Sequence, residues 1–400
     1  ISMRLTGNKG WLIAAIVWNL GILLVFKYLN FILSNVGYLM DRNFVITDIR
    51  LPIGISFFTF QILSYIFDVY AGKVKPQKSL YKFALYVSMF PQLVAGPIVR
   101  YSQIAAEIDD RKENRTEFND GFIRFVYGLG KKVILSNYMG TIADNMFYLS
   151  GNSNLSAASA WLGGIAYTLQ IYYDFSGYSD MAIGLGRMFG FHFKENFDYP
   201  YVSSSIREFW RRWHISLSGW FREYLYIPLG GNRKGKFRTV VNKMIVFLVT
   251  GIWHGASLNF LFWGAYHGFF LMLEEYVPSI VKKGGRLKSI LQHIYALLVV
   301  CVGFVFFRAD TMTQGAMIVR RMFTGFHMNA GALSLVMQQL TPVYLLTLVC
   351  ALIAATPVHR ILSRNEAYSR LTYMFSLAGF LLCVLSLAGG TYNPFIYFRF

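Results

Sequence analysis

The sequence predicts an all-α, polytopic integral membrane protein with roughly nine or ten membrane segments. Hydrophobic residues make up 55% of the 400 residues, charged residues only 14%, and the mean hydropathy is +0.42. Soluble domains carry about a quarter charged residues. Apolar runs of about 20 residues, long enough to cross a bilayer, recur along the chain. Because these runs are continuous rather than alternating, they favour helices over a closed barrel.

The net charge and the cysteines argue against a nucleic-acid-binding protein and against a metal site. A net charge of +18 could indicate nucleic-acid binding in a soluble protein. In a membrane protein, basic residues instead gather in short loops and hold them on the cytoplasmic side, so we expect no nucleic-acid partner. The three cysteines lie in apolar segments without ligand spacing, so we expect buried thiols and no metal site. The chain begins with Ile1 before a loop-like sequence, and we expect native N-terminal sequence to precede it.

The amino-terminal half is predicted to contain four spans and one broken segment. The predicted spans are residues 11–34, 51–70, 119–149 and 157–190. A basic loop from Lys73 to Lys82 follows the second span. Residues 83–99 are apolar but are interrupted by Pro91, Gly96 and Pro97. This pattern predicts a kinked or re-entrant segment, which a membrane protein tolerates only where protein or a cavity surrounds it.

The carboxy-terminal half is predicted to hold the remaining spans. Long apolar stretches cover residues 244–277, 289–307, 342–358 and 372–390. The sequence has no long-period repeat and no low-complexity tract, so we assign residues 1–400 to a single membrane domain.

Residues 200–243 form a basic, aromatic segment within that domain. Nine Lys and Arg residues stand there against two acids, Glu208 and Glu223. Ser205 and Glu208 fit a capping box, which predicts the start of a helix. On one continuous helix, one stripe would carry Trp210, Trp213, His214, Leu217, Trp220, Phe221 and Tyr224. The neighbouring stripe would carry Arg207, Arg211, Ser218 and Arg222.

Two interpretations of this segment stay open. It could be an amphipathic helix at the cytoplasmic interface, with arginines toward anionic lipid and tryptophans at the depth of the headgroups. It could instead be a re-entrant helix that lines a cytoplasmic funnel. There the arginines would bind a phosphate-rich donor such as coenzyme A, because a guanidinium binds phosphate in a bidentate manner.

Two histidines stand in the apolar run GIWHGASLNFLFWGAYHG, residues 251–268. An intramembrane histidine is a candidate for function, although the G-x-x-x-G patterns here also indicate close helix packing. His254 and His267 lie about 220° apart on one helix, so one of them should be structural unless the helix breaks. His254 has Trp253 and small residues beside it, whereas bulky residues follow His267. We therefore expect His254 to be the accessible ring.

These motifs resemble a known family. REFWRRWHISLSGWFREYLYIPLGGNRKGK and TGIWHGASLNFLFWGAYHG are similar to the two signature regions of the membrane-bound O-acyltransferases, most closely the branch of alginate and peptidoglycan O-acetyltransferases. GISFFTFQILSYIFDVYAG, FPQLVAGPIVRYSQ and the ending NPFIYFRF agree. The resemblance covers nearly the whole chain and implies helices around a central tunnel. It places the invariant histidine of the family at His254 and its second, nearly invariant residue at His214.

The resemblance implies an acyl transfer from a thioester to a hydroxyl. We assign His254 as general base or transient acyl carrier and His214 as the residue that orients the donor or intermediate. The residues expected to line the donor path or tunnel are Arg207, Arg211, Arg222, Trp210, Trp213 and Trp253. Asn259 could contact the oxyanion. Asp174 and Asp180 could each pair with an arginine to fix helix packing, or could orient a catalytic imidazole.

The expected function is O-acetylation of an exported cell-wall or extracellular polysaccharide. We expect no bound cofactor, with acetyl-CoA or another pantetheine thioester as the donor. The expected partners are membrane lipid, the polysaccharide and an extracytoplasmic acetyltransferase or esterase-like protein, and the expected location is the bacterial inner membrane. D-alanyl or fatty-acyl transfer through the same fold is the alternative. A transporter is a weaker alternative, because the inverted repeats typical of transporters are not apparent.

Overall fold

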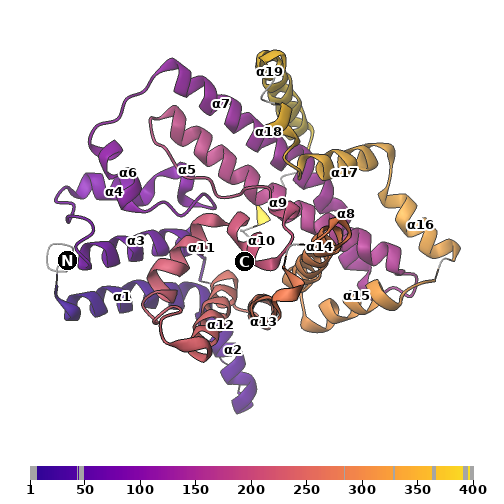
Figure 1. The fold of residues 1–400 in the computed structure, drawn as a ribbon, viewed down its shortest axis with the longest axis horizontal. Helices are drawn as coiled ribbons and strands as arrows, with labels where there is room; N and C mark the ends of the chain where they lie inside the picture. Colours follow the sequence, from indigo (N-terminus) through magenta and orange to yellow (C-terminus); the bar gives the residue numbers. More distant parts are fainter. Residues whose placement is uncertain are drawn as a thin grey trace.

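The computed structural model describes residues 7–42, 44, 49–282, 284–327, 329–362, 366–390 and 395–396. Every regular element in these residues is a helix, which confirms the predicted all-α fold. Figure 1 shows the helices in a broad assembly, with the carboxy-terminal end near its centre.

The described residues of the amino-terminal half form nine α-helices. They are α1 (Lys9–Leu23), α2 (Leu29–Met40), α3 (Ile55–Tyr70), α4 (Leu80–Ser88), α5 (Phe90–Leu93), α6 (Tyr101–Asp109), α7 (Arg115–Gly130), α8 (Asn137–Tyr148) and α9 (Ala157–Met188). Wider helical turns, η2 (Leu24–Tyr28) and η3 (Lys131–Ser136), join α1 to α2 and α7 to α8 without a break. A short turn, η4 (Leu149–Gly151), ends α8.

In the part of the carboxy-terminal half that the structure describes, there are ten further α-helices. They are α10 (Ile206–Arg212), α11 (Ile215–Phe221), α12 (Gly235–His254), α13 (Leu258–Tyr276), α14 (Arg286–Arg308), α15 (Met312–Thr324), α16 (Ala330–Gln339), α17 (Pro342–Ala354), α18 (Val358–Leu362) and α19 (Glu366–Gly389). Short helical turns stand at η5 (Pro200–Val202), η6 (Arg222–Tyr226) and η7 (Pro278–Ile280).

The centre of the fold is α9, which packs against α7, α8, α14 and α15. Its contact with α7 is close because glycines face each other across it. A Cβ on Gly128 would lie 2.5 Å from the carbonyl oxygen of Gly177, and one on Gly184 would lie 2.5 Å from that of Gly121. Since no side chain fits into these gaps, the glycines allow the two backbones to approach.

The interrupted segment at residues 83–99 is broken as predicted. Helix α4 ends at Ser88, Met89 is extended, and α5 continues for only four residues. The chain beyond it is enclosed by protein, because Ala95, Ile98 and Val99 are almost fully buried. Irregular backbone is therefore shielded from lipid here, as a membrane protein requires.

Several helices are long and apolar enough to cross a membrane. By length and composition they are Lys9–Met40, Arg286–Arg308 and Leu371–Gly389. A bent pair, α16 and α17, adds a fourth candidate if its two helices form one broken span with an angle of 71° between them. These helices agree with a polytopic membrane protein, while the total of nine or ten segments stays a prediction.

Two predicted continuous helices are in fact broken. The stretch 244–277 divides at residues 255–257 into the antiparallel helices α12 and α13, and α12 begins at Gly235 rather than at 244. The basic, aromatic helix breaks at Trp213 and His214 into α10 and α11. The predicted angle between His254 and His267 and the predicted arginine stripe both assumed unbroken helices, so both were wrong.

Candidate active site

His254 is the last residue of α12. Gly255 is extended and ends the helix, and the Ser257 hydroxyl caps α13 by accepting from the amide N–H of Asn259 at 3.3 Å. The two helices then run back against each other at close range. A Cβ on Gly251 would lie 2.2 Å from the carbonyl oxygen of Phe260, so this glycine is required for the hairpin that holds His254 in place.

The imidazole of His254 lies among aromatic rings. Trp253, Trp263 and Phe307 lie 5.0, 5.1 and 5.2 Å away between ring centroids, all at steep angles. His254 is 7% exposed, compared with none for His267. The expectation that His254 is the more accessible ring agrees with this small difference, although neither ring is open to bulk solvent.

His214 stands at the break between α10 and α11. Its backbone adopts the left-handed conformation, with φ of 45°, which is uncommon for a residue with a side chain. This turn is held by a hydrogen bond that the backbone N–H of Ile215 donates to the Asn196 carbonyl oxygen, at 2.9 Å. The ring is buried, packs edge-on against Phe175 at 4.5 Å, and places Nδ1 3.2 Å from the Asn196 amide oxygen.

The structure brings the two predicted histidines to one place. The ring centroid of Trp253 lies 6.2 Å from that of His214 and 5.0 Å from that of His254. Trp253, which was predicted to line the donor path or tunnel, is thus a neighbour of both rings; its role in the tunnel stays a prediction. Two further tryptophans of the predicted set lie elsewhere: Trp213 packs against Phe209 and Phe304, and Trp210 packs against Trp263 and His267.

The three arginines of the predicted stripe are exposed but do not share one helix. Arg207 and Arg211 lie on α10, whereas Arg222 begins the wider turn that follows α11. The break at His214 reorients the chain between them, because a left-handed residue interrupts the helical rotation. Arg207 approaches Glu275 at 3.8 Å. The three guanidinium groups are therefore carried by separate helical segments and not by one stripe of a continuous helix.

His267 is a closely packed ring. Trp210, Trp263 and Tyr266 surround it at 5.1 to 5.4 Å between centroids. A Cβ on Gly303 would lie 2.7 Å from the Nε2 atom of His267, so the backbone of α14 packs directly against the imidazole. Among the described residues neither ring nitrogen has a hydrogen-bond partner, and the same holds for the indole N–H of Trp263.

The predicted orienting residues have other partners. Asp174 forms a buried ion pair with Lys132 and accepts a hydrogen bond from the backbone N–H of Ile396 at 2.9 Å. Asp180 pairs with Arg124 and Lys131. The helix-packing interpretation of these carboxylates is therefore supported, with lysine taking part beside the expected arginine.

Asn259, the predicted oxyanion contact, also has a structural partner. Its amide nitrogen donates to the carbonyl oxygen of Ala309 at 2.5 Å and ties the start of α13 to the end of α14. The buried donor without an acceptor beside His254 is instead the indole N–H of Trp263, within the part of the chain that the structure describes.

Two residues near the histidines escaped the sequence analysis. Asn196 contacts His214, and Lys27 donates to the carbonyl oxygens of Trp253 and His254 at 2.7 and 3.2 Å. A lysine amine there complements the carbonyl end of α12, where the helix dipole is negative. Lys27 is a single charged residue within the first apolar run. Because an intramembrane charge needs a partner, the sequence could have indicated that this lysine contacts a polar group on another helix.

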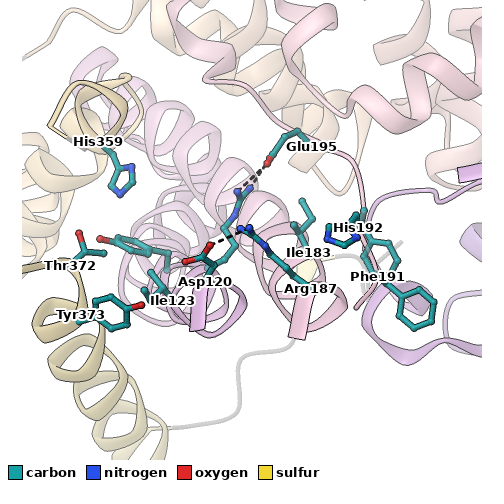
Figure 2. Close-up of a pocket in the computed structure, with 13 residues that line it drawn as sticks. Asp120, Ile123, Ile183, Arg187, Phe191, His192, Glu195, His359, Thr372 and Tyr373 are labelled. Atoms are coloured by element: carbon teal, nitrogen blue, oxygen red, sulfur yellow. Dashed lines mark hydrogen bonds and ion pairs between the residues drawn. The ribbon is translucent and has the colours of Figure 1, made fainter. Parts of the chain in front are cut away.

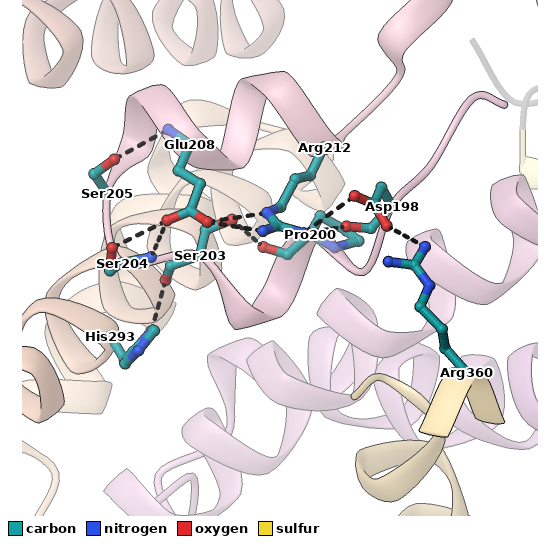
Figure 3. A network of polar contacts seen from close by, with 9 residues as sticks. All are labelled: Asp198, Pro200, Ser203, Ser204, Ser205, Glu208, Arg212, His293 and Arg360. Atoms are coloured by element: carbon teal, nitrogen blue, oxygen red, sulfur yellow. Dashed lines mark hydrogen bonds and ion pairs between the residues drawn. The ribbon is translucent and has the colours of Figure 1, made fainter. Parts of the chain in front are cut away.

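Two polar features fix the chain on either side of Asn196. Figure 2 shows a cavity of about 480 Å³ in which Arg124 binds Glu195 at 2.6 to 3.0 Å. Figure 3 shows Arg212 between Glu208 and Asp198, with Arg360 on the far side of Asp198. Both networks anchor the extended segment that carries Asn196, and neither contains His214 or His254.

Comparison with known proteins places this arrangement among acyltransferases. The model of the membrane-bound O-acyltransferase family matches residues 16–309. The chain is 39% identical over 423 residues to the probable alginate O-acetylase AlgI of Pseudomonas putida, which covers the whole chain and 86% of that protein. It is 35% identical over 340 residues to the peptidoglycan O-acetyltransferase of Helicobacter pylori, covering 78% of the chain and 64% of that protein. It is 28% identical over 272 residues to the teichoic acid D-alanyltransferase of Bacillus subtilis, covering 64% and 68%.

Proposed function

Because the chain belongs to the membrane-bound O-acyltransferase family and is therefore an O-acyltransferase, we propose that it moves an acetyl group from a cytoplasmic thioester to hydroxyls of an exported polysaccharide. The transfer crosses the membrane and reaches the acceptor directly or through a secreted esterase-like partner. Relatives named alginate O-acetylase and peptidoglycan O-acetyltransferase support both the acetyl group and a polysaccharide acceptor. We place this multi-pass protein in the bacterial inner membrane, where one bilayer separates the donor from the acceptor.

The observation that carries this proposal is that His214 and His254 both lie beside the same ring, that of Trp253. His214 stands at the break between α10 and α11, whereas His254 is the last residue of α12. Acyl transfer needs a base for the hydroxyl proton and a second group that holds the reacting atoms, and imidazole suits both tasks near neutral pH.

The proposed reaction uses His254 as general base. The imidazole removes the proton of the acceptor hydroxyl while the oxygen attacks the thioester carbonyl carbon. The C–S bond then breaks, and the leaving thiolate takes the proton from the imidazolium. The indole N–H of Trp263, next to His254, is a suitable donor to the transient oxyanion because a buried N–H without an acceptor is prepared for new negative charge. Alternatively, His254 carries the acetyl group transiently.

The donor is proposed to be acetyl-CoA or another pantetheine thioester. The exposed guanidinium groups of Arg207, Arg211 and Arg222 suit its phosphates, because charge-assisted contacts to phosphate are strong and bidentate. A slender pantetheine arm can pass between packed helices, whereas the nucleotide would stay at the membrane surface with the arginines.

D-alanyl transfer is the main alternative, because the teichoic acid D-alanyltransferase shares 28% identity with the chain. Fatty-acyl transfer through the same fold is a further one. The donor distinguishes these reactions. Purified protein given acetyl-CoA or an acyl-loaded carrier protein in parallel would accept one and leave the other unused.

The proposal can be tested in sealed proteoliposomes of known orientation. Labelled acetyl-CoA is supplied on the side of Arg207 and Arg211, and an alginate or peptidoglycan fragment is enclosed on the other side, with candidate partner protein where needed. We expect acetylated fragment inside with the wild type and none with His254→Ala. His192→Ala is the control, because that ring is exposed and pairs with Glu107.

Two results would contradict the proposal. A folded His254→Ala protein that still transfers acetyl at the wild-type rate would remove His254 from the mechanism. Product found solely on the donor side of a sealed bilayer would exclude transfer across the membrane, even with an essential His254.

A further inference from the structure

Asn196 lies in the extended segment after α9, and its side chain is fully buried at the break between α10 and α11. Three groups surround its amide oxygen Oδ1. The His214 Nδ1 atom lies 3.2 Å away, the backbone N–H of Ser216 donates at 3.2 Å, and the Ser216 hydroxyl donates at 2.8 Å. This amide therefore connects the histidine to the first turn of α11.

The surrounding donors identify the atom that faces His214 as oxygen. A backbone N–H can only donate, so the amide atom that meets the N–H of Ser216 must be an acceptor. The other end of the amide agrees, because Nδ2 donates to the Ser179 hydroxyl at 3.0 Å. The Ser216 hydroxyl in turn accepts from the backbone N–H of Ile98 at 3.0 Å and keeps its hydrogen for Asn196.

This assignment determines the tautomer of His214. An amide oxygen carries no hydrogen, so the hydrogen in its contact with Nδ1 must belong to the imidazole. A neutral imidazole has one N–H, and Nε2 is then left with a lone pair. Among the described residues Nε2 has no hydrogen-bond partner, and it is buried, since His214 is only 1% exposed.

The segment that carries Asn196 is held at both ends. Arg124 binds the neighbouring Glu195, and the backbone N–H of Asp198 donates to the carbonyl of Arg212 at 2.9 Å (Figures 2 and 3). In a second backbone hydrogen bond, the N–H of Ile215 donates to the carbonyl oxygen of Asn196 itself. The amide oxygen is therefore fixed in place before any substrate arrives.

We propose that Asn196 is a positioning residue that keeps His214 as the Nδ1–H tautomer and so reserves Nε2 to accept a hydrogen bond from the substrate. The complementary group is a hydroxyl of the acceptor or an amide N–H of the pantetheine arm, because both carry the hydrogen that Nε2 lacks. This inference rests on the proposed function, since it needs His214 to meet a substrate. It assigns His214 the role of an acceptor, complementary to the base at His254.

The test compares pH profiles of kcat/KM for wild type, Asn196→Asp and Asn196→Ala. A carboxylate keeps the acceptor at Nδ1 but also stabilises the imidazolium, so Nε2 becomes protonated at higher pH. We expect the acid limb of Asn196→Asp to move up by about one pH unit or more. Asn196→Ala releases the tautomer, and we expect kcat to fall about 10- to 100-fold. A merely structural role would not move the acid limb.

Ser216→Ala is the matched control. It removes one hydrogen bond to the same amide oxygen and leaves the Ile98 N–H without its acceptor, but it keeps the Ser216 backbone N–H that orients Asn196. We expect it to lower the melting temperature and to leave the acid limb in place. If Asn196→Ala fails to fold, Asn196→Asp still tests the proposal, because it preserves all three acceptor contacts.

The outcomes separate this inference from the proposed function. An Asn196→Asp profile that superimposes on the wild type, in an enzyme that His214→Ala inactivates, would overturn the inference alone. A fully active His214→Ala enzyme would overturn the role of His214 and this inference together. As a measurement without turnover, nitrogen NMR of histidine-labelled protein, with His214→Gln to assign the signal, should show Nδ1 protonated; a protonated Nε2 in the neutral ring would also overturn it.

Discussion

Replacing Gly251 by alanine should displace His254. The added Cβ would lie 2.2 Å from the carbonyl oxygen of Phe260, and real Cβ atoms essentially never approach closer than 3.0 Å. Helices α12 and α13 must therefore separate locally by about 0.8 Å. His254 lies one turn beyond Gly251 on the same helix, so its ring moves with the backbone. A misplacement of about 1 Å can lower a rate about 10²-fold, and overpacking of this kind costs about 1–3 kcal/mol of stability.

The assay measures acetyl transfer and thermal unfolding of purified Gly251→Ala. We expect kcat to fall about 10²-fold and the melting temperature to decrease, while the protein still inserts into the membrane. Gly21→Ala is the matched control, because Gly21 is also helical and a Cβ there meets nothing within 4 Å. That variant should keep its activity and be at least as stable, since alanine favours a helix interior by about 1 kcal/mol.

A Gly251→Ala enzyme with wild-type kcat and melting temperature would refute this reasoning. It would mean that the α12–α13 contact can open without moving His254, or that the position of His254 does not limit the reaction. A loss of stability at full activity would refute only the link between this contact and catalysis.

Further predictions concern three other sites. His267→Ala should lower the melting temperature more than kcat, because that ring fills a closely packed space; a stable but inactive variant would make His267 a catalytic residue instead. Replacing both Arg207 and Arg211 with glutamine should raise the KM for the donor and weaken its dependence on salt, as measured in initial-rate assays from low to high ionic strength. A hydrogen bond from Arg187 lowers the pKa of Glu117 below its ordinary value of 4.5, so this carboxylate stabilises the fold above that pH and stops doing so as the pH falls through the lowered value. The melting temperature of Glu117→Gln should therefore fall less between pH 6 and pH 3 than that of the wild type, and equal decreases would contradict the contribution of this pair.

The helical membrane fold could be predicted because its cause is local. A run of apolar residues in lipid has to bond its own backbone, whatever the rest of the chain does. The break at Pro91, Gly96 and Pro97 also has a local cause and could be predicted, since proline lacks the N–H that a helix needs. The family followed from motifs that are contiguous in the sequence, and the family model matches residues 16–309. The same motifs predict His214 and His254 as site residues.

The breaks at His214 and at residues 255–257 were not predicted, and only the second has a local signal in the sequence. Ser257 is a usual helix cap, but the apolar residues on both sides favoured one long span. Nothing next to His214 requires a left-handed residue. That conformation is held by Asn196, which lies 18 residues earlier and accepts hydrogen bonds across the break.

The sequence alone therefore determined the membrane environment, the class of fold and the family, and it predicted the two histidines as site residues, because hydropathy and short motifs depend on neighbours along the chain. The tertiary structure alone decided the surroundings of those histidines, with Trp253 beside both rings and Lys27 at the end of α12, and it decided that Lys132 is the partner of Asp174. Buried polar groups must find partners within a few ångströms, and in a packed bundle those partners come from whichever helix lies alongside. Which helix that is depends on where the chain breaks and how closely glycines let the backbones approach, and both follow from the whole fold.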